Sequence, residues 1–173
     1  VDSMSVVTRN GLNERLERLR VDLLAMIDLV GQRVTEVTTA LLERDVAHAD
    51  ALVVGDDQID LMSQNIEELC VDTLVREQPV AGDLRAIVAA MHMNSDIERS
   101  GDLTTNIAKA VGRLQGLKPD DRIRELILRM SEQARFLLER AGEAYGALDQ
   151  EMAASIVELD DVLDDLHRTY IQA

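Results

Sequence analysis

Apolar residues recur at three- and four-residue steps along most of the chain, which is the spacing of one face of an α-helix. The first stripe starts at Leu12 and predicts a helix of about eight or nine turns that ends near Arg44. It consists of Leu12, Leu16, Leu19, Leu23, Met26, Ile27, Val30, Val34, Val37 and Leu41. A second stripe follows the predicted N-cap Asp45 and predicts one helix from about Val46 to Glu77, which Pro79 ends.

Three further helices are predicted in the rest of the chain. The first covers roughly 81–114, with Gly116 as its end signal. The next covers roughly 120–147, with Pro119 expected at its first helical position, and the last begins after the cap Asp149. Connections of a few residues place consecutive helices antiparallel to each other. Because glycine, proline and aromatic residues are also scarce, the sequence predicts an all-α fold of antiparallel helical bundles.

An internal repeat relates the two halves of the chain. A shift of 104 residues places Asp45 on Asp149 and the segment GDDQIDLM on LDDVLDDL without a gap. We therefore expect two bundles in tandem, a three-helix bundle in 1–116 and two helices of a second, repeat-related bundle in 117–173. The repeat predicts a further helix beyond Ala173. In its absence, another copy of the chain is expected to cover the apolar faces of the last two helices by swapping or dimerisation, giving a homo-oligomer.

The charge balance narrows the classes of partner. There are 33 acidic and 18 basic residues, a net charge of −15, which argues against binding nucleic acid or anionic lipid. No run approaches the ~20 apolar residues of a transmembrane helix, and no secretory signal is recognisable. Cys70 is the single cysteine, so no internal disulfide can form, and its apolar surroundings predict a packed core thiol. We expect a cytoplasmic protein.

Acidic residues of the second and third predicted helices fall at matching heights. Asp60 and Glu98 each lie 19 residues from Pro79, and Asp56 and Asp102 each lie 23 residues from it. In an antiparallel hairpin these positions face each other, with Asp57 beside them. Carboxylate oxygens at one level suit Mg, Ca, Mn or Fe ions. The alternative is a solvated acidic face, which many acidic helical proteins carry.

Other chemistries find little support in the sequence. It has no glycine-rich phosphate loop, nucleotide fingerprint or Ser-His-Asp arrangement, and no nucleophile is evident beside the acidic residues, so we do not expect an enzyme. Arg76 and Arg85 flank the predicted turn at Pro79 and could dock a partner's carboxylates. The alternative is that both cap helix ends or pair with Glu77 and Asp83.

The stretch 76–111, REQPVAGDLRAIVAAMHMNSDIERSGDLTTNIAKAV, resembles the signature region of the PhoU family of phosphate-uptake regulators. The matching residues are Arg76, Gln78, Pro79, Asp83, Leu84, Arg85, Glu98, Arg99, Asp102, Asn106, Ile107 and Ala108. The resemblance implies a fold of two similar three-helix bundles. In this chain the last helix of the second bundle, with its own acidic motif, is missing, and Asp160, Asp161 and Asp164 could supply only half of a second metal site.

The resemblance also implies a function without catalysis. PhoU-like proteins are cytoplasmic or peripheral to the inner face of the membrane, and they restrain phosphate uptake and phosphate-starvation signalling. Their partners are the ATPase of the phosphate ABC transporter and a sensor histidine kinase. Family members with paired acidic motifs bind multinuclear metal clusters, and the matching positions here are Asp56, Asp60, Glu98 and Asp102. Fe, Zn, Mn and Mg are the candidate metals. The alternative is a metal-free helical adaptor that oligomerises.

Overall fold

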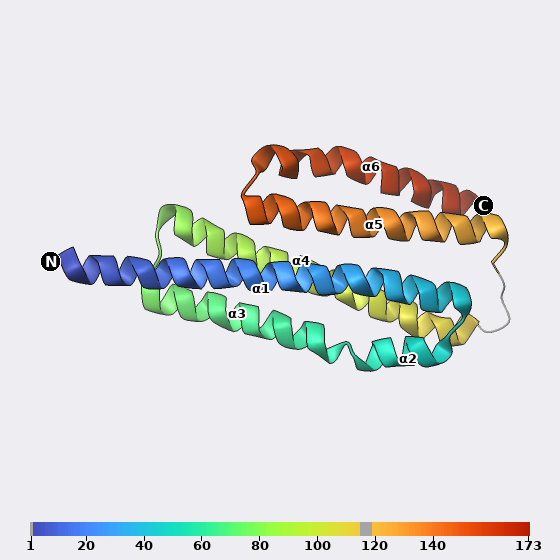
Figure 1. Ribbon diagram of the computed structural model, residues 1–173, viewed down its shortest axis with the longest axis horizontal. Coiled ribbons are helices and arrows are strands. Elements are labelled where there is room, and N and C mark those ends of the chain that lie inside the picture. The colour runs from blue at the N-terminus through green and yellow to red at the C-terminus, as the bar shows by residue number, and fades with distance from the viewer. Residues whose placement is uncertain (1, 115–118) are drawn as a thin grey trace.

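Every element of the described chain is a helix, as the apolar pattern predicts (Figure 1). The computed structural model describes the backbone of residues 2–114 and 119–173, and side chains from Gly11 onward. None of the described helices is both long and apolar enough to cross a bilayer. The helices are α1 (Asp2–Glu43), α2 (Val46–Val54), α3 (Asp57–Glu77), α4 (Ala81–Val111), the short 3-10 helix η1 (Gly112–Leu114), α5 (Asp121–Ala147) and α6 (Gln150–Gln172).

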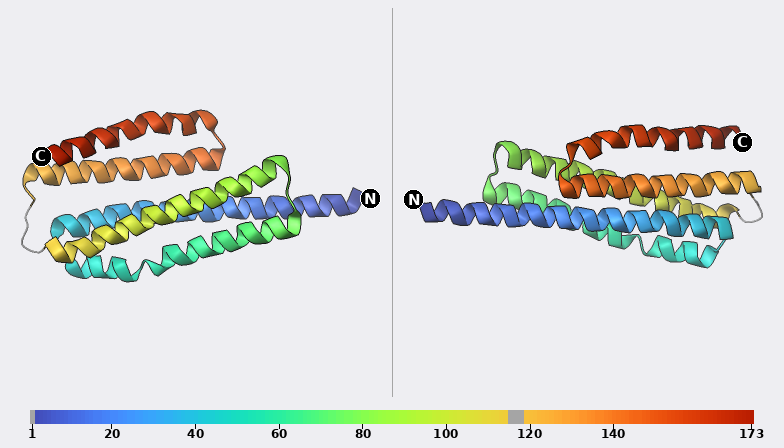
Figure 2. Two further views of the ribbon diagram at one scale, coloured as in Figure 1. Left: turned by 180° about the vertical axis from the view of Figure 1, so that it is seen from behind. Right: turned by 45° about the horizontal axis from the view of Figure 1, so that its top comes forward.

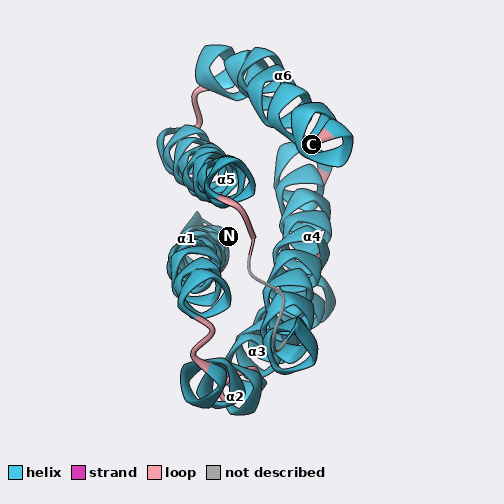
Figure 3. Ribbon diagram, turned by 90° about the vertical axis from the view of Figure 1, so that its right-hand side faces the viewer, coloured by secondary structure: helices cyan, strands magenta, loops and turns pink. Residues whose placement is uncertain are grey.

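The long helix α1 lies at the centre of the arrangement. The antiparallel pair α3 and α4 packs on one side of α1, and α4 crosses it obliquely (Figure 2). The antiparallel pair α5 and α6 lies on the other side, with α5 against α1. Seen along the helices, α6, α5, α1 and α2 follow one another down one side, and α4 lies opposite (Figure 3).

The main core fills the space between α1, α3 and α4. Leu23 and Met26 of α1 are fully buried there against Ile66 of α3 and Ile87 of α4. Burial of each such side chain contributes about 1.5–3 kcal/mol to folding, which is why the period of the apolar stripe determines which helix faces meet. A smaller apolar cluster, which includes Val37 and Ala49, packs α2 against the end of α1 and the end of α4.

Aspartate caps fix three helix starts. The carboxylates of Asp45, Asp120 and Asp149 each accept a backbone N–H three residues on, at 2.8–2.9 Å. The predicted caps Asp45 and Asp149 are thereby confirmed. The prediction that Pro119 opens a helix is wrong, because Asp120 takes the cap position and α5 begins after it. The end signal Gly116, and with it the predicted boundary between bundles, lies outside the described residues.

The long helices differ from the prediction at two ends. α1 begins at Asp2, ahead of the expected start at Leu12, because a helix can extend beyond the stripe that packs it. α4 ends at Val111 and continues as the 3-10 turn of η1, where the prediction had one α-helix to residue 114.

The prediction of one helix from Val46 to Glu77 is wrong. The chain breaks into α2 and α3 at Gly55 and Asp56. The guanidinium of Arg33 on α1 donates to the carbonyls of Leu52 and Gly55, and the Gly55 carbonyl also accepts the backbone N–H of Gln58 at 3.4 Å. A side chain from another helix thus adds hydrogen bonds to backbone carbonyls at the break.

A mostly apolar groove of about 460 Å³ lies between α1, α4 and α5, with Leu163 of α6 at its edge. Its α4 wall includes Leu103, which is 58% exposed, and Ile107, which is 40% exposed. On the last two helices, whose apolar faces the repeat predicts to be uncovered, Phe136 of α5 is 41% exposed and Val157 of α6 is 73% exposed. Their coverage by another copy of the chain stays a prediction.

Cys70 is fully buried in the main core, as the sequence predicts. Burial raises the pKa of its thiol to about 11, so about one thiol in a thousand is ionised at pH 8. We expect the folded protein to resist Ellman's reagent at pH 8 and to react at once in guanidinium chloride. Rapid reaction of the folded protein would contradict the buried position of this thiol.

Candidate metal centre

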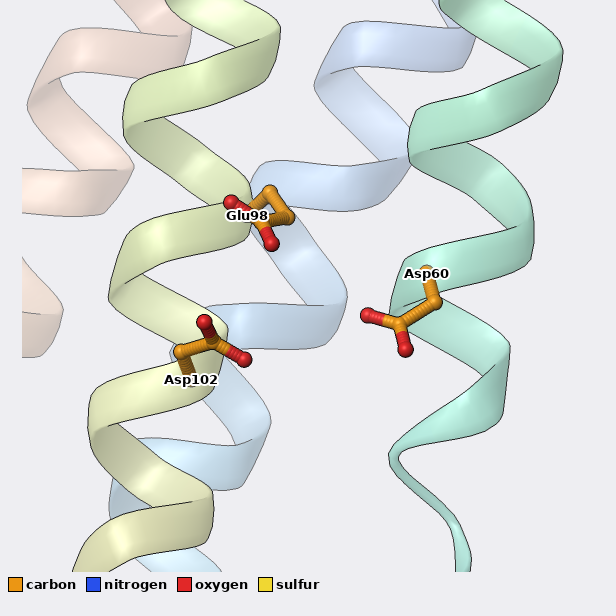
Figure 4. A group of neighbouring side chains, drawn as sticks. All are labelled: Asp60, Glu98 and Asp102. Carbon is orange, nitrogen blue, oxygen red and sulfur yellow. The ribbon is translucent and has the colours of Figure 1, made fainter.

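Three carboxylates from two helices converge near the start of α3. Glu98 and Asp102 lie one turn apart on the same face of α4, and Asp60 reaches toward them from α3 (Figure 4). One oxygen from each carboxylate can be chosen so that all three lie within 4.8 Å of one another. Asp60 and Asp102 are exposed and Glu98 is half-buried, so the cluster (Asp60, Glu98 and Asp102) opens to solvent.

The other two predicted acidic residues lie differently. The Asp56 carboxylate oxygen Oδ1 lies 3.6 Å from Arg33 Nη1, so Asp56 is already paired with a cation. Asp57 is the first residue of α3 and is exposed. The structure therefore brings together three of the five residues that the height argument selected, and it places Asp56 at the break that precedes them.

The three carboxylates repel one another electrostatically. The pKa of Glu98 is raised above its usual value, first by burial and then by the negative charges of Asp102 and Asp60, against a smaller lowering by Arg99. The charge of Asp56 raises it further. Like charges held this close favour either a proton or a bound cation.

Gly101, which has no side chain, lets α3 and α4 pack closely beside the cluster. Gly101 directly precedes Asp102, and Ile59 directly precedes Asp60. A Cβ atom on Gly101 would lie 2.9 Å from Ile59 Cδ1 and 3.1 Å from Ile59 Cγ2. Because Ile59 is 1% exposed, this contact is tight and holds the two carboxylate-bearing turns together.

A buried amide lies one turn from the cluster. Asn94, four residues before Glu98, donates from Nδ2 to the carbonyl and hydroxyl of Ser63 at 3.1 and 3.0 Å. Asn94 is 6% exposed, and its Oδ1 has no hydrogen-bond partner among the described residues. The cluster itself offers only oxygen donors, which fits a hard cation such as Mn²⁺ or Mg²⁺. The residues present therefore fit the metal that the family resemblance implies.

The two arginines at the hairpin have different surroundings. Arg76 donates a hydrogen bond to Asp72 on the same helix, and Asp72 also accepts one from Arg15 of α1 at 2.7 Å. The expected pairing of Arg76 with Glu77 or Asp83 is thus replaced by pairing with Asp72. Arg85 lies exposed near the start of α4. Surface ion pairs such as Arg76–Asp72 contribute little to the free energy of folding, so this pairing does not argue against a docking role for Arg76.

Sequence reasoning missed Arg33, a buried arginine that touches the start of the site. A signal for it was present, because Arg33 interrupts the apolar stripe of α1 three residues after Val30 and four before Val37. An arginine at a core position needs partners on a neighbouring element.

The chain is similar to known proteins that share one family name. Residues 23–111 match a family model described as the PhoU domain. A Pseudomonas putida protein named phosphate-specific transport system accessory protein PhoU homolog is 35% identical over 162 residues, 92% of this chain and 62% of that relative. A second relative, phosphate-specific transport system accessory protein PhoU homolog 2 of Mycobacterium tuberculosis, is 36% identical over 162 residues, 92% of this chain and 76% of its own length.

Solved structures show the same arrangement of helices. The crystal structure of PhoU from Pseudomonas aeruginosa matches with a TM-score of 0.85 and 32% identity, covering 92% of this chain and 77% of that one. The phosphate transport system regulatory protein PhoU from Streptococcus pneumoniae matches with a TM-score of 0.84 and 26% identity, covering 92% and 74%. This chain spans less than two thirds of the Pseudomonas putida relative.

Proposed function

This chain belongs to the PhoU family, and from this premise we propose that it regulates phosphate transport by docking to other proteins. The observation that carries the proposal is the match over 92% of the chain to relatives named as accessory proteins of a phosphate-specific transport system. The family is one of regulatory and accessory proteins, so the expected action is binding rather than catalysis. The sign of the regulation is negative: the protein restrains phosphate uptake and starvation signalling.

The proposed partners are the ATPase of the phosphate transporter and a sensor histidine kinase. Both act at the cytoplasmic face of the membrane, so the proposal places this chain in the cytoplasm or against that face. The hairpin end between α3 and α4 carries two exposed arginines, Arg76 and Arg85, which can contact carboxylates of a partner. Charged groups of this kind affect the rate and specificity of association more than its strength.

A cation at the cluster of Asp60, Glu98 and Asp102 completes the proposal. A bound Fe, Zn, Mn or Mg ion would supply positive charge that offsets three negative charges and links α3 to α4. The carboxylates of this chain provide the oxygen ligands, and Asp56, which lies one turn before Asp60, is held by Arg33. Asp57 is exposed beside them and could join a larger, multinuclear site.

Binding to the purified ATPase and the purified kinase tests the docking function. We expect the immobilised chain to bind at least one of them and Arg76→Ala/Arg85→Ala to associate more slowly, with a weaker dependence on salt. The matched control is Arg122→Ala/Arg129→Ala, which removes two exposed arginines of α5. Absence of binding to both partners, with and without Mn²⁺, would contradict the docking proposal.

The same assay separates a metal-dependent regulator from a plain adaptor. If Asp60→Asn/Glu98→Gln/Asp102→Asn binds the partners as tightly as the wild type in the presence of Mn²⁺, docking does not use the cluster. The chain would then act as a helical adaptor with a solvated acidic face, a reading that the exposure of Asp60 and Asp102 favours.

A further inference from the structure

Arg33 is a charged side chain enclosed in the protein. It lies ten residues before the end of α1 and is 5% exposed. Removing a guanidinium from water costs several kcal/mol unless its donors are satisfied. Here Nη1 donates to the Leu52 carbonyl at 3.0 Å, Nη2 donates to the Gly55 carbonyl, and the Asp56 carboxylate lies 3.6 Å from Nη1. Leu52 belongs to the last turn of α2, and Gly55 and Asp56 form the break between α2 and α3.

The break leads directly into the acidic cluster. The backbone carbonyl of Asp56 accepts the N–H of Ile59 at 2.9 Å and the N–H of Asp60 at 3.4 Å. The residue whose carboxylate pairs with Arg33 therefore also opens the first turn of α3. Asp60 ends that turn and Ile59 packs against Gly101, so the direction of the first turn determines where the Asp60 carboxylate lies relative to α4.

Gly55 gives the Arg33 guanidinium room at the break. A Cβ on Gly55 would lie 2.9 Å from Arg33 Nη2, so glycine lets the guanidinium approach this backbone without displacement. A planar guanidinium can donate to two carbonyls and a carboxylate at once, which the ammonium of lysine cannot do in the same geometry. Arginine at position 33 and glycine at position 55 therefore both favour the hydrogen bonds at this break.

We propose that Arg33 is a positioning residue of the cation site, which holds the start of α3 so that Asp60 faces Glu98 and Asp102. The inference rests on the proposed cation site and assigns a role to a residue that is not a ligand. Groups that orient metal ligands without touching the metal typically change affinity by about 10–100-fold when they are removed.

Electrostatics and positioning predict opposite results for the loss of Arg33. Arg33→Met removes a positive charge near the cluster and frees the Asp56 carboxylate, so electrostatics alone would tighten the binding of a cation. If Arg33 positions Asp60, the same substitution weakens binding although the charge has become more favourable. The sign of the change therefore distinguishes the two effects.

The test is a titration of the full chain with Mn²⁺, in which electron paramagnetic resonance measures free Mn²⁺. We expect Arg33→Met to raise the dissociation constant by about 10–100-fold and Arg33→Lys to raise it as well. The matched control Arg18→Met removes an exposed arginine from the same helix and should stay within about twofold, because a distant exposed charge is screened. Amide hydrogen exchange without metal should become faster at Ile59 and Asp60, while Leu23 stays protected.

Each outcome decides a separate point. Binding by Arg33→Met that equals or exceeds that of the wild type, with unchanged exchange at Ile59 and Asp60, would overturn the positioning role and leave the cation site intact. Wild-type protein that binds no Mn²⁺ would remove the site and this inference together. If Arg33→Met loses its helical circular dichroism, Arg33→Lys decides by the same comparison.

Discussion

Neutralising Asp60, Glu98 and Asp102 together should abolish the stabilisation of this protein by Mn²⁺. Asp60→Asn/Glu98→Gln/Asp102→Asn keeps the shape of each side chain and removes the charges that a hard cation requires. For the wild type, Mn²⁺ at 100 times its dissociation constant should add about 2.7 kcal/mol to the free energy of unfolding. That gain corresponds to a rise in melting temperature of about 5–10 °C for a chain of this size, and the triple variant should show none.

The same variant should not be less stable when metal is removed. Two of the three positions are exposed and the third is half-buried, and their charges repel one another. In EDTA we therefore expect the triple variant to melt at or above the temperature of the wild type. Thermal unfolding followed by circular dichroism, with metal content by mass spectrometry, measures both effects.

A control with the same change in charge isolates the cluster. Glu125→Gln/Glu132→Gln/Glu158→Gln neutralises three exposed acidic residues of α5 and α6. It should keep the full response to Mn²⁺. If the wild type and this control gain no stability and hold no metal, the cluster is a solvated acidic face and the cation site is wrong.

Gly101→Val should lower the free energy of unfolding by about 2–3 kcal/mol. The added Cβ would meet Ile59 at 2.9 Å, and the branched side chain would also approach Val30, which lies 3.7 Å from the position of that Cβ. Both neighbours are buried, so relief requires α3 and α4 to separate. Separation moves Asp60 away from Asp102, and the affinity for Mn²⁺ should fall with stability. Urea unfolding and the Mn²⁺ titration measure the two losses.

Gly82→Val is the matched control for this substitution. Gly82 belongs to the same helix, and a Cβ there meets nothing within 4 Å. Because valine has a better helix propensity than glycine, the control should change stability by less than about 0.5 kcal/mol. Equal losses of stability at both positions would show that contact with Ile59 does not determine the result at Gly101.

The helical layout and the core of the candidate site follow from local sequence. Helices are rods with a fixed rise of about 1.5 Å per residue, so counting from the turn at Pro79 gives the height of every side chain on both arms. Asp60 and Glu98, equidistant from Pro79, therefore meet as predicted. Asp102 joins them because it lies one turn from Glu98.

The break at Gly55 could not be predicted by the same reasoning. Apolar positions continue in helical register from Leu52 through Ile59, and a single glycine is tolerated within many helices. Two of the hydrogen bonds that stabilise the break come from Arg33, about twenty residues away in sequence and on another helix. An interaction between residues so far apart has only an indirect sign in the sequence, which is the arginine within the apolar stripe of α1.

The central position of α1 has a consequence for the order in which the chain assembles. α3 pairs with α4, and α5 with α6, across short connections that close quickly. α1 and α5, by contrast, are joined through Arg20 to the Gly146 carbonyl, 126 positions apart, and through Arg124 to the Leu42 carbonyl, 82 positions apart. Such closures carry a larger entropic cost. During synthesis α1, α3 and α4 leave the ribosome before α5, so α3 and α4 can cover one face of α1 while its other face still waits for α5.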